Sequence, residues 1–131
     1  MSDTGFRAIA TRALAGAIMS AVVTAAPPAH ADAFEQVTDK QEFVDLVEGR
    51  TLRYPGVRLT VSRQGAINGK GLGIPVTGAW QWRGGFFCRD LFWGERELGA
   101  NCQAVLRNGL GTTLRFVSDQ GSGQSADFRL R

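Results

Sequence analysis

Histidine is almost absent from this 131-residue chain, and its absence removes the most common catalytic base. The one histidine, His30, lies in a stretch that we expect to be cleaved off. Serine and cysteine hydrolases of the usual kind need a histidine to take the proton from their nucleophile. Two cysteines without histidine also cannot complete a tetrahedral zinc site unless carboxylates help. We therefore expect neither a catalytic triad nor a metal centre.

A long apolar run is also missing, although residues 13–26 are uncharged and rich in small side chains. A membrane-spanning helix needs about 20 apolar residues, and this run is shorter. Two arginines precede it, two prolines follow it, and Ala29-His30-Ala31 supplies the small residues that a signal peptidase accepts. This pattern predicts a signal peptide over residues 1–31 and a protein in the periplasm or outside the cell. No transmembrane segment is expected after cleavage.

Net charge is small in the expected mature chain, residues 32–131, which we predict to be one domain. It keeps 13 basic and 11 acidic residues, which leaves a net charge of +2. Such a charge is ordinary for a soluble domain and gives no reason to expect a nucleic-acid partner.

Lysine is scarce, and arginine outnumbers it by eleven to two in residues 32–131. Four arginines fall on the expected outward faces of strands: Arg58, Arg107, Arg115 and Arg129. Guanidinium groups pair well with phosphates and carboxylates, such as those of envelope lipids or the cell wall. Scattered surface charge mostly serves solubility, however, and we prefer that interpretation.

Cysteine is limited to Cys88 and Cys102. An even number of cysteines in an exported protein predicts a disulfide, and a C-x-x-C redox or zinc pattern is absent. Closing a loop of this length stabilises a fold by roughly 3 kcal/mol. We expect residues 89–101, between the cysteines, to be the longest irregular stretch, with the bridge joining its two ends.

A short helix is expected near the start of the mature chain. Residues 38–41 read Thr-Asp-Lys-Gln, a capping box with Thr38 as N-cap and Gln41 reaching back. Gly49 stands where a left-handed C-cap is expected. The apolar residues at helical spacing between these caps are Phe43, Val44, Leu46 and Val47. We expect a helix of about three turns that plugs one end, or covers one face, of the structure formed by the residues after it.

From Arg50 onward the apolar pattern has a period of two, which is typical of strands with one buried and one exposed face. The pattern is clearest at residues 57–61, 76–82, 114–116 and 128–130. Glycine-containing turn signals separate these runs. We predict seven or eight short antiparallel strands in a closed or nearly closed, calycin-like barrel, with a sandwich as the alternative.

Paired carboxylates would still allow an enzyme, since glycoside hydrolysis needs only two. Asp90, Glu95 and Glu97 lie between the cysteines, interleaved with Arg89 and Arg96. Such a mixture is explained more simply by surface ion pairs. We assign no catalytic residue.

Two glycine patterns, at residues 69–74 and 121–126, have part of the lettering of a dinucleotide-binding fingerprint. That fingerprint works where its loop opens a helix inside a βαβ unit. Such a unit is not predicted here, so both patterns are interpreted as turns and no cofactor is expected.

Gly78-Ala79-Trp80 resembles the G-x-W motif of lipocalins, which bind small apolar ligands inside a barrel. In that family the motif lies in the first strand, whereas here two or three strands precede it. A core tryptophan packed across a glycine is the simpler explanation. In either case we expect Trp80 and Trp82 to line an interior with room for side chains or one small ligand.

Residues 76–80, 85–90 and 101–103 (VTGAW, GFFCRD and NCQ) resemble a group of short exported proteins of Gram-negative bacteria. The likeness extends from about Phe34 to the end of the chain. Some of these proteins are labelled dihydrodipicolinate reductase, which implies a nicotinamide-binding Rossmann domain with a histidine and a lysine at the site. The chain is too short for that domain, so we do not expect that activity.

Two functional hypotheses follow. The first is a non-enzymatic binding module for a small ligand or an envelope protein, with an inhibitor of an envelope enzyme such as lysozyme as one form of it. Small periplasmic lysozyme inhibitors share this architecture, although their inhibitory loop motif is not evident here. The second is an enzyme that uses the loop carboxylates. The candidate contact residues are Trp80, Trp82, Arg89, Asp90, Phe92, Trp93 and Glu95.

Overall fold

The computed structural model describes residues 15–24 and 33–131. The predicted cleavage position lies outside these ranges. Residues 15–24 are exposed and form neither helix nor strand. Within the described ranges, no helix has the length and apolar character needed to cross a membrane.

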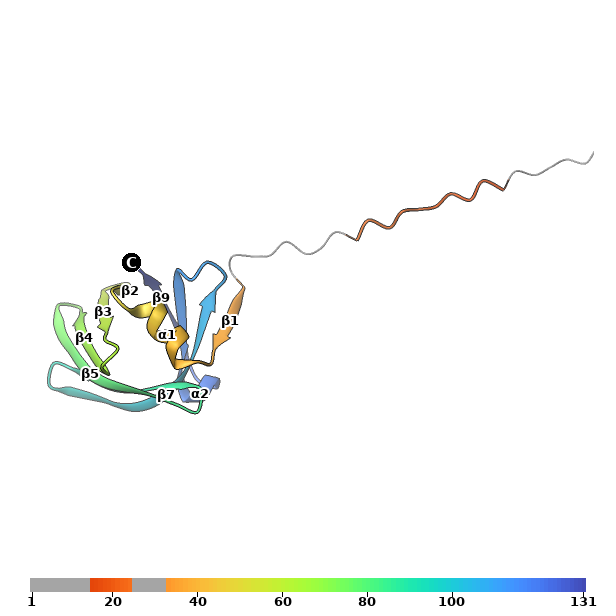
Figure 1. The fold of residues 1–131 in the computed structure, drawn as a ribbon. Coiled ribbons are helices and arrows are strands. Elements are labelled where there is room, and N and C mark those ends of the chain that lie inside the picture. Colours follow the sequence, from red (N-terminus) through yellow and green to blue (C-terminus); the bar gives the residue numbers. More distant parts are fainter. Residues whose placement is uncertain (1–14, 25–32) are drawn as a thin grey trace, which may run out of the picture.

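Residues 33–131 form a closed antiparallel β-barrel (Figure 1). Eight strands make the barrel, in the order β7-β6-β5-β4-β3-β2-β9-β8, and pairing of β8 with β7 closes it. The predicted barrel is thereby confirmed, and β1 is an extra strand. The strands are β1 (Phe34–Val37), β2 (Leu52–Tyr54), β3 (Val57–Val61), β4 (Ala66–Gly71), β5 (Ile74–Arg83), β6 (Phe86–Trp93), β7 (Arg96–Asn108), β8 (Thr113–Val117) and β9 (Ser125–Leu130). Two helices accompany them, α1 (Lys40–Val47) and α2 (Ser118–Gly121).

The long strand β7 closes the barrel because its two halves pair with different strands. Its first half pairs with β6, as far as Gln103 opposite Phe87. Its second half pairs with β8 on one side and with the extra strand β1 on the other. Val105 is therefore opposite both Phe116 and Val37 and is fully buried.

Helix α1 forms where predicted, but its N-cap is Asp39 and not Thr38. Asp39 has an extended backbone and its carboxylate accepts a hydrogen bond from the Gln41 amide at 3.1 Å. A carboxylate is an acceptor only and carries the charge that a helix N-terminus favours. The Thr38 carbonyl instead accepts a hydrogen bond from the Trp82 indole. The helix spans eight residues, shorter than predicted, and Gly49 follows it with a φ of 70°.

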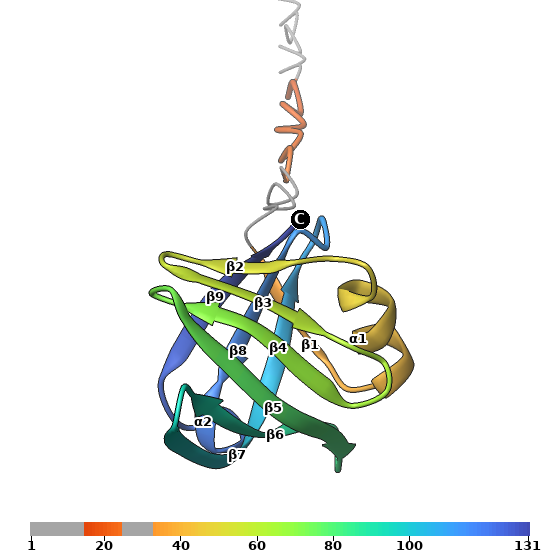
Figure 2. The same ribbon diagram turned by 90° about the vertical axis from the view of Figure 1, so that its left-hand side faces the viewer.

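Helix α1 plugs one end of the barrel, as predicted. Phe43 is fully buried and its ring centroid lies within 5.0 to 5.3 Å of the rings of Phe87, Trp82 and Trp80. Figure 2 shows α1 at one end of the barrel and α2 toward the other. The aromatic core is thus concentrated at the α1 end.

The two cysteines form the predicted disulfide. Cys88 of β6 and Cys102 of β7 are direct cross-strand partners, so the bridge fastens a regular hairpin. The expectation that residues 89–101 are irregular is therefore wrong. A register shift beside Leu91 displaces the alternation by one residue, and charged side chains on both strand faces hide the period. A disulfide suggests an oxidising, non-cytoplasmic compartment.

Candidate functional site

The barrel interior is hollow at the end opposite α1, where a cavity of about 410 Å³ opens to solvent. Inward-facing side chains of seven strands form its wall. The apolar part of the wall includes Leu52, Leu59, Ile67, Leu91, Phe116 and Phe128. The polar part consists of Arg89, Gln103, Ser118, Gln124 and Ser125. A mostly apolar cavity with a few polar groups is the usual form of a small-ligand site.

Strand β6 places a charge in this apolar wall through simple alternation. Phe87, Arg89 and Leu91 belong to the cavity wall, whereas Cys88 and Asp90 alternate with them along the strand. An arginine thus occupies an inward-facing position of the barrel, between the apolar Phe87 and Leu91. Cys88 and its disulfide hold β6 against β7 directly beside it.

Arg89 is half-buried and has few protein partners. Its Nη1 donates a hydrogen bond to the Gly99 carbonyl oxygen at 2.7 Å, at the bulge where β6 and β7 change register. Burial lowers the pKa of the Arg89 guanidinium, and the nearby Asp90 carboxylate raises it in partial compensation. Arginine still carries its charge at neutral pH. Within the described residues this is the only side-chain hydrogen bond of Arg89, although a guanidinium has five N–H donors.

The β8–β9 connection, residues 118–124, contributes Ser118 and Gln124 to the cavity wall. Asp119 and Gln120 both have left-handed backbones, with φ of 54° and 56°. Asn101 holds this turn: its amide nitrogen donates to the Asp119 carboxylate at 2.8 Å, and its oxygen accepts from the Asp119 amide at 2.9 Å. Strained backbone persists where surrounding contacts fix it, often at binding sites. This part of the cavity wall is therefore built as a fixed turn.

Tyr54, at the end of β2, also lines the cavity. Its ring packs on Phe128 with 5.5 Å between centroids, and 46% of the residue remains exposed. An aromatic side chain that is half in contact with the cavity and half in water suits a ligand that enters from solvent.

The three tryptophans were predicted as contact residues, and each donates its indole N–H to a backbone carbonyl. Trp80 is buried at the plugged end and donates to Ser62. Trp82 stacks on Phe43 beside it. Trp93 is half-buried at the other end and donates to Gly71 at 2.8 Å. None of the three is among the residues that line the cavity.

Gly78 explains the G-x-W pattern structurally. A Cβ at this position would overlap the backbone carbonyl oxygen of Asp90, so only glycine lets β5 lie against β6 here. Trp80, two residues on, is 4% exposed. The tryptophan is therefore a core residue, as the simpler explanation predicted.

The other candidate contacts lie away from the cavity. Phe92 is 38% exposed and pairs with Glu97 near the hairpin tip, where Glu95 occupies the turn. Asp90 pairs with small alanines on both sides, and its Oδ1 is buried without a hydrogen-bond partner in the described residues. No cluster of three or more histidine, cysteine, aspartate or glutamate side chains suited to a metal ion occurs in residues 15–24 and 33–131.

Sequence reasoning found Arg89 but missed most of the cavity wall. Tyr54 and Gln103 were not singled out because neither type of residue marks an interior by itself. The alternation did place Leu59, Phe116 and Phe128 on one face of their strands. What it could not show is that these faces meet around an unfilled space, because that depends on register and closure.

Comparison with known proteins adds no further identification. No family model, curated protein or solved structure matches this chain.

Proposed function

We propose that this protein binds a small apolar ligand with one anionic group inside its barrel, and that it acts as a binding module and not as an enzyme. The observation that carries the proposal is Arg89, a half-buried cation and the one charged residue among those that line this mostly apolar cavity. The ligand class follows from the shape and chemistry of this cavity.

Partial burial of the Arg89 guanidinium costs folding free energy unless hydrogen-bond acceptors replace the water that it loses. A charge removed from water without adequate partners destabilises the folded state. Here the protein supplies one backbone carbonyl, that of Gly99. A carboxylate is the natural complement, because it accepts two parallel hydrogen bonds from a guanidinium. The surrounding leucine and phenylalanine side chains would hold an aliphatic or aromatic body.

The size of the cavity limits the ligand. At about 410 Å³ it lies toward the lower end of small-ligand sites, which range from about 300 to 1,000 Å³. A medium-chain fatty acid or a compact aromatic acid fits this description.

The proposed setting is the periplasm or the extracellular medium. The leader pattern of residues 1–31 and the disulfide both support export. Mass spectrometry of the protein purified from a bacterial envelope fraction tests this: we expect a chain that starts at Asp32 and has lost two hydrogens to the bridge. An intact leader or free thiols would contradict export.

Calorimetric titration with decanoate and with decanol tests the ligand class. We expect decanoate to bind more tightly than decanol, and R89Q to remove that difference because the guanidinium is gone. R96Q, at an exposed position in the hairpin, is the charge-matched control and should bind as the wild type does. Equal affinity of R89Q and wild-type protein for decanoate would overturn the proposal.

A further inference from the structure

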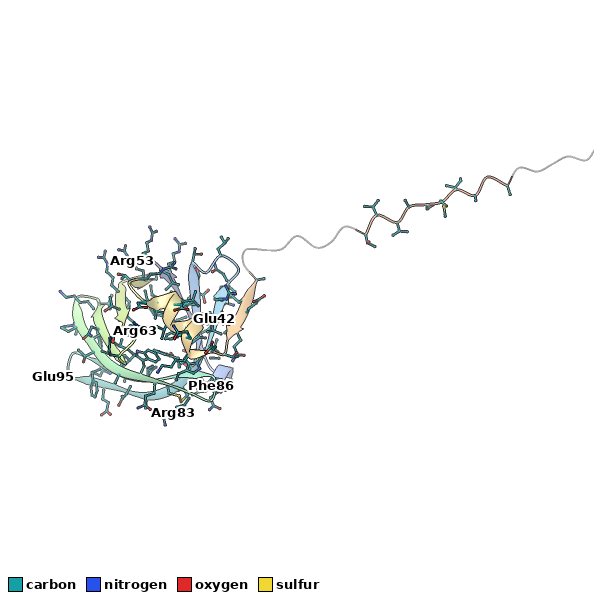
Figure 3. The ribbon with its side chains drawn as sticks, in the orientation of Figure 1. Glu42, Arg53, Arg63, Arg83, Phe86 and Glu95 are labelled. Atoms are coloured by element: carbon teal, nitrogen blue, oxygen red, sulfur yellow. A yellow bond between two sulfur atoms is a disulfide. The ribbon has the colours of Figure 1, made fainter. Side chains whose placement is uncertain are left out.

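Four cations form one row across the outside of the barrel. Arg129 of β9 pairs with Arg53 of β2, Arg53 pairs with Arg58 of β3, and Arg58 pairs with Lys70 of β4. All four residues are exposed. At the usual strand spacing the row extends over roughly 14 Å. Figure 3 shows Arg53 projecting away from the barrel.

The row has no acidic counterpart. Within the described part of the chain, none of the four cations forms an ion pair. The outward positions of β2, β3 and β4 hold no acid, and Asp127 on β9 is engaged by Arg115 at 2.7 Å. Like charges directly opposite each other destabilise a sheet. The row therefore costs folding stability, and an external anion is what would offset that cost.

Exposed apolar side chains adjoin the row. The β2–β3 and β4–β5 turns lie next to each other, linked by a hydrogen bond from the Leu72 amide to the Gly56 carbonyl at 2.7 Å (Figure 2). Leu72 is 74% exposed, and Tyr54 and Ile74 beside the turns are 46% and 39% exposed. A hollow of about 520 Å³ lies between the turns and the row, lined in part by Arg53, Arg58 and Lys70.

Leu72 occupies a conformation that leucine disfavours. Its φ is 51°, in the left-handed region where glycine or asparagine is favoured. A leucine there both strains the backbone and exposes an apolar side chain. Its side chain lies over Gly56 of the neighbouring turn and still remains mostly exposed.

From this juxtaposition we propose that this end of the barrel docks on an anionic lipid bilayer. The cation row contacts the headgroups, while Leu72, Tyr54 and Ile74 insert at the interface between headgroups and acyl chains. Basic residues and exposed apolar residues on one face are the combination that interfacial binding requires. Tyr54 also lines the cavity, so the cavity of a docked barrel would lie close to the membrane. Docking itself does not depend on the ligand proposed above.

Cosedimentation with vesicles tests the charge requirement. We expect binding to vesicles that contain phosphatidylglycerol, weak binding to pure phosphatidylcholine, and a loss of binding as salt screens the charges. R53Q/R58Q should reduce the partition coefficient about 25-fold, since each cation near an anionic surface contributes roughly a factor of five. R63Q/R83Q removes two exposed arginines at the α1 end and should have little effect.

The apolar requirement is tested by L72N. Asparagine suits the left-handed turn, so this variant should fold at least as stably as the wild type while partitioning roughly tenfold more weakly. L110N, which changes a leucine 71% exposed at the α1 end, is the matched control. All variants carry the same N-terminal residues, so differences between them report the substituted positions.

Three results would overturn docking: equal binding to both kinds of vesicle, an equal loss in R63Q/R83Q, or unchanged binding by L72N. Binding to heparin without binding to vesicles would also overturn it and would indicate a polyanionic polymer as partner. Decanoate titration separates the two proposals. R53Q/R58Q should keep decanoate binding, and R89Q should keep vesicle binding.

Discussion

Arg89 and Gly99 are joined across the β6–β7 hairpin by a 2.7 Å hydrogen bond from the guanidinium Nη1 to the backbone carbonyl oxygen. Gly99 lies at the bulge and has a φ of 81°, a backbone conformation that favours glycine. Bulges commonly redirect a side chain beside a binding site. The bond holds Arg89 at the cavity wall and leaves its other donors available.

Removal of the disulfide should destabilise the barrel substantially. For C88A/C102A we expect the free energy of unfolding to fall by about 3 kcal/mol, because the reduced chain regains the entropy of a loop with a sequence separation of 14. Urea denaturation of the variant and of the oxidised wild type measures the difference. Equal midpoints would show that the bridge does not contribute to stability.

The aromatic plug should depend on Phe43. F43A removes a fully buried ring that contacts both interior tryptophans of β5, and we expect a loss of about 3 to 5 kcal/mol. L46A, a partly buried position on the same helix, should cost clearly less. Thermal unfolding ranks the two variants, and a larger loss in L46A would contradict the assignment of Phe43 as the plug.

Gly78 and Gly109 should differ in their tolerance of alanine. A Cβ at Gly78 meets the Asp90 carbonyl and the Leu91 side chain, whereas a Cβ at Gly109 meets nothing within 4 Å. G78A should therefore unfold at a lower temperature or fail to fold, and G109A should match the wild type or gain slightly. If G78A is as stable as G109A, the close approach of β5 and β6 is not required.

The ion pair between Arg115 and Asp127 should be visible in the acid limb of the stability profile. The hydrogen bond from Arg115 holds the pKa of Asp127 below its ordinary value of 3.8. The ion pair therefore contributes to the free energy of unfolding above pH 3.8, and this contribution is lost as the pH falls through the lower pKa of Asp127 in the folded state. D127N should flatten the pH dependence of unfolding free energy below about pH 4. An unchanged pH dependence in D127N would show that Asp127 does not contribute to stability in this pH range.

The sequence predicts the barrel because its strands alternate. Leu59, Phe116 and Phe128 point inward from three strands, and a period of two is enough to assign each face. The same reasoning misses β1, whose four residues include one buried side chain, Val37. A pattern with one buried position carries no period.

The candidate site was only partly predictable. Arg89 was named as a candidate contact among the charges between the two cysteines, but its place inside the barrel follows from the register of β6. The cation row illustrates the same limit. Arg58 and Arg129 were assigned to outward faces and interpreted as scattered surface charge, whereas strand order aligns them with Arg53 and Lys70. The order and register of the strands decide which residues are neighbours across a sheet. The residue pattern within a single strand does not show them.

The role of Arg89 as the partner of a bound anion is tested most directly by the pKa of a ligand carboxyl group inside the barrel. Decanoate labelled with ¹³C at the carboxyl carbon can be titrated by NMR while bound. If Arg89 pairs with the carboxylate, the pKa of the bound group should lie below that of free decanoate, and R89Q should shift it above. A bound carboxyl pKa at or above the free value in the wild-type protein would contradict the account, since apolar burial without a cationic partner has that effect.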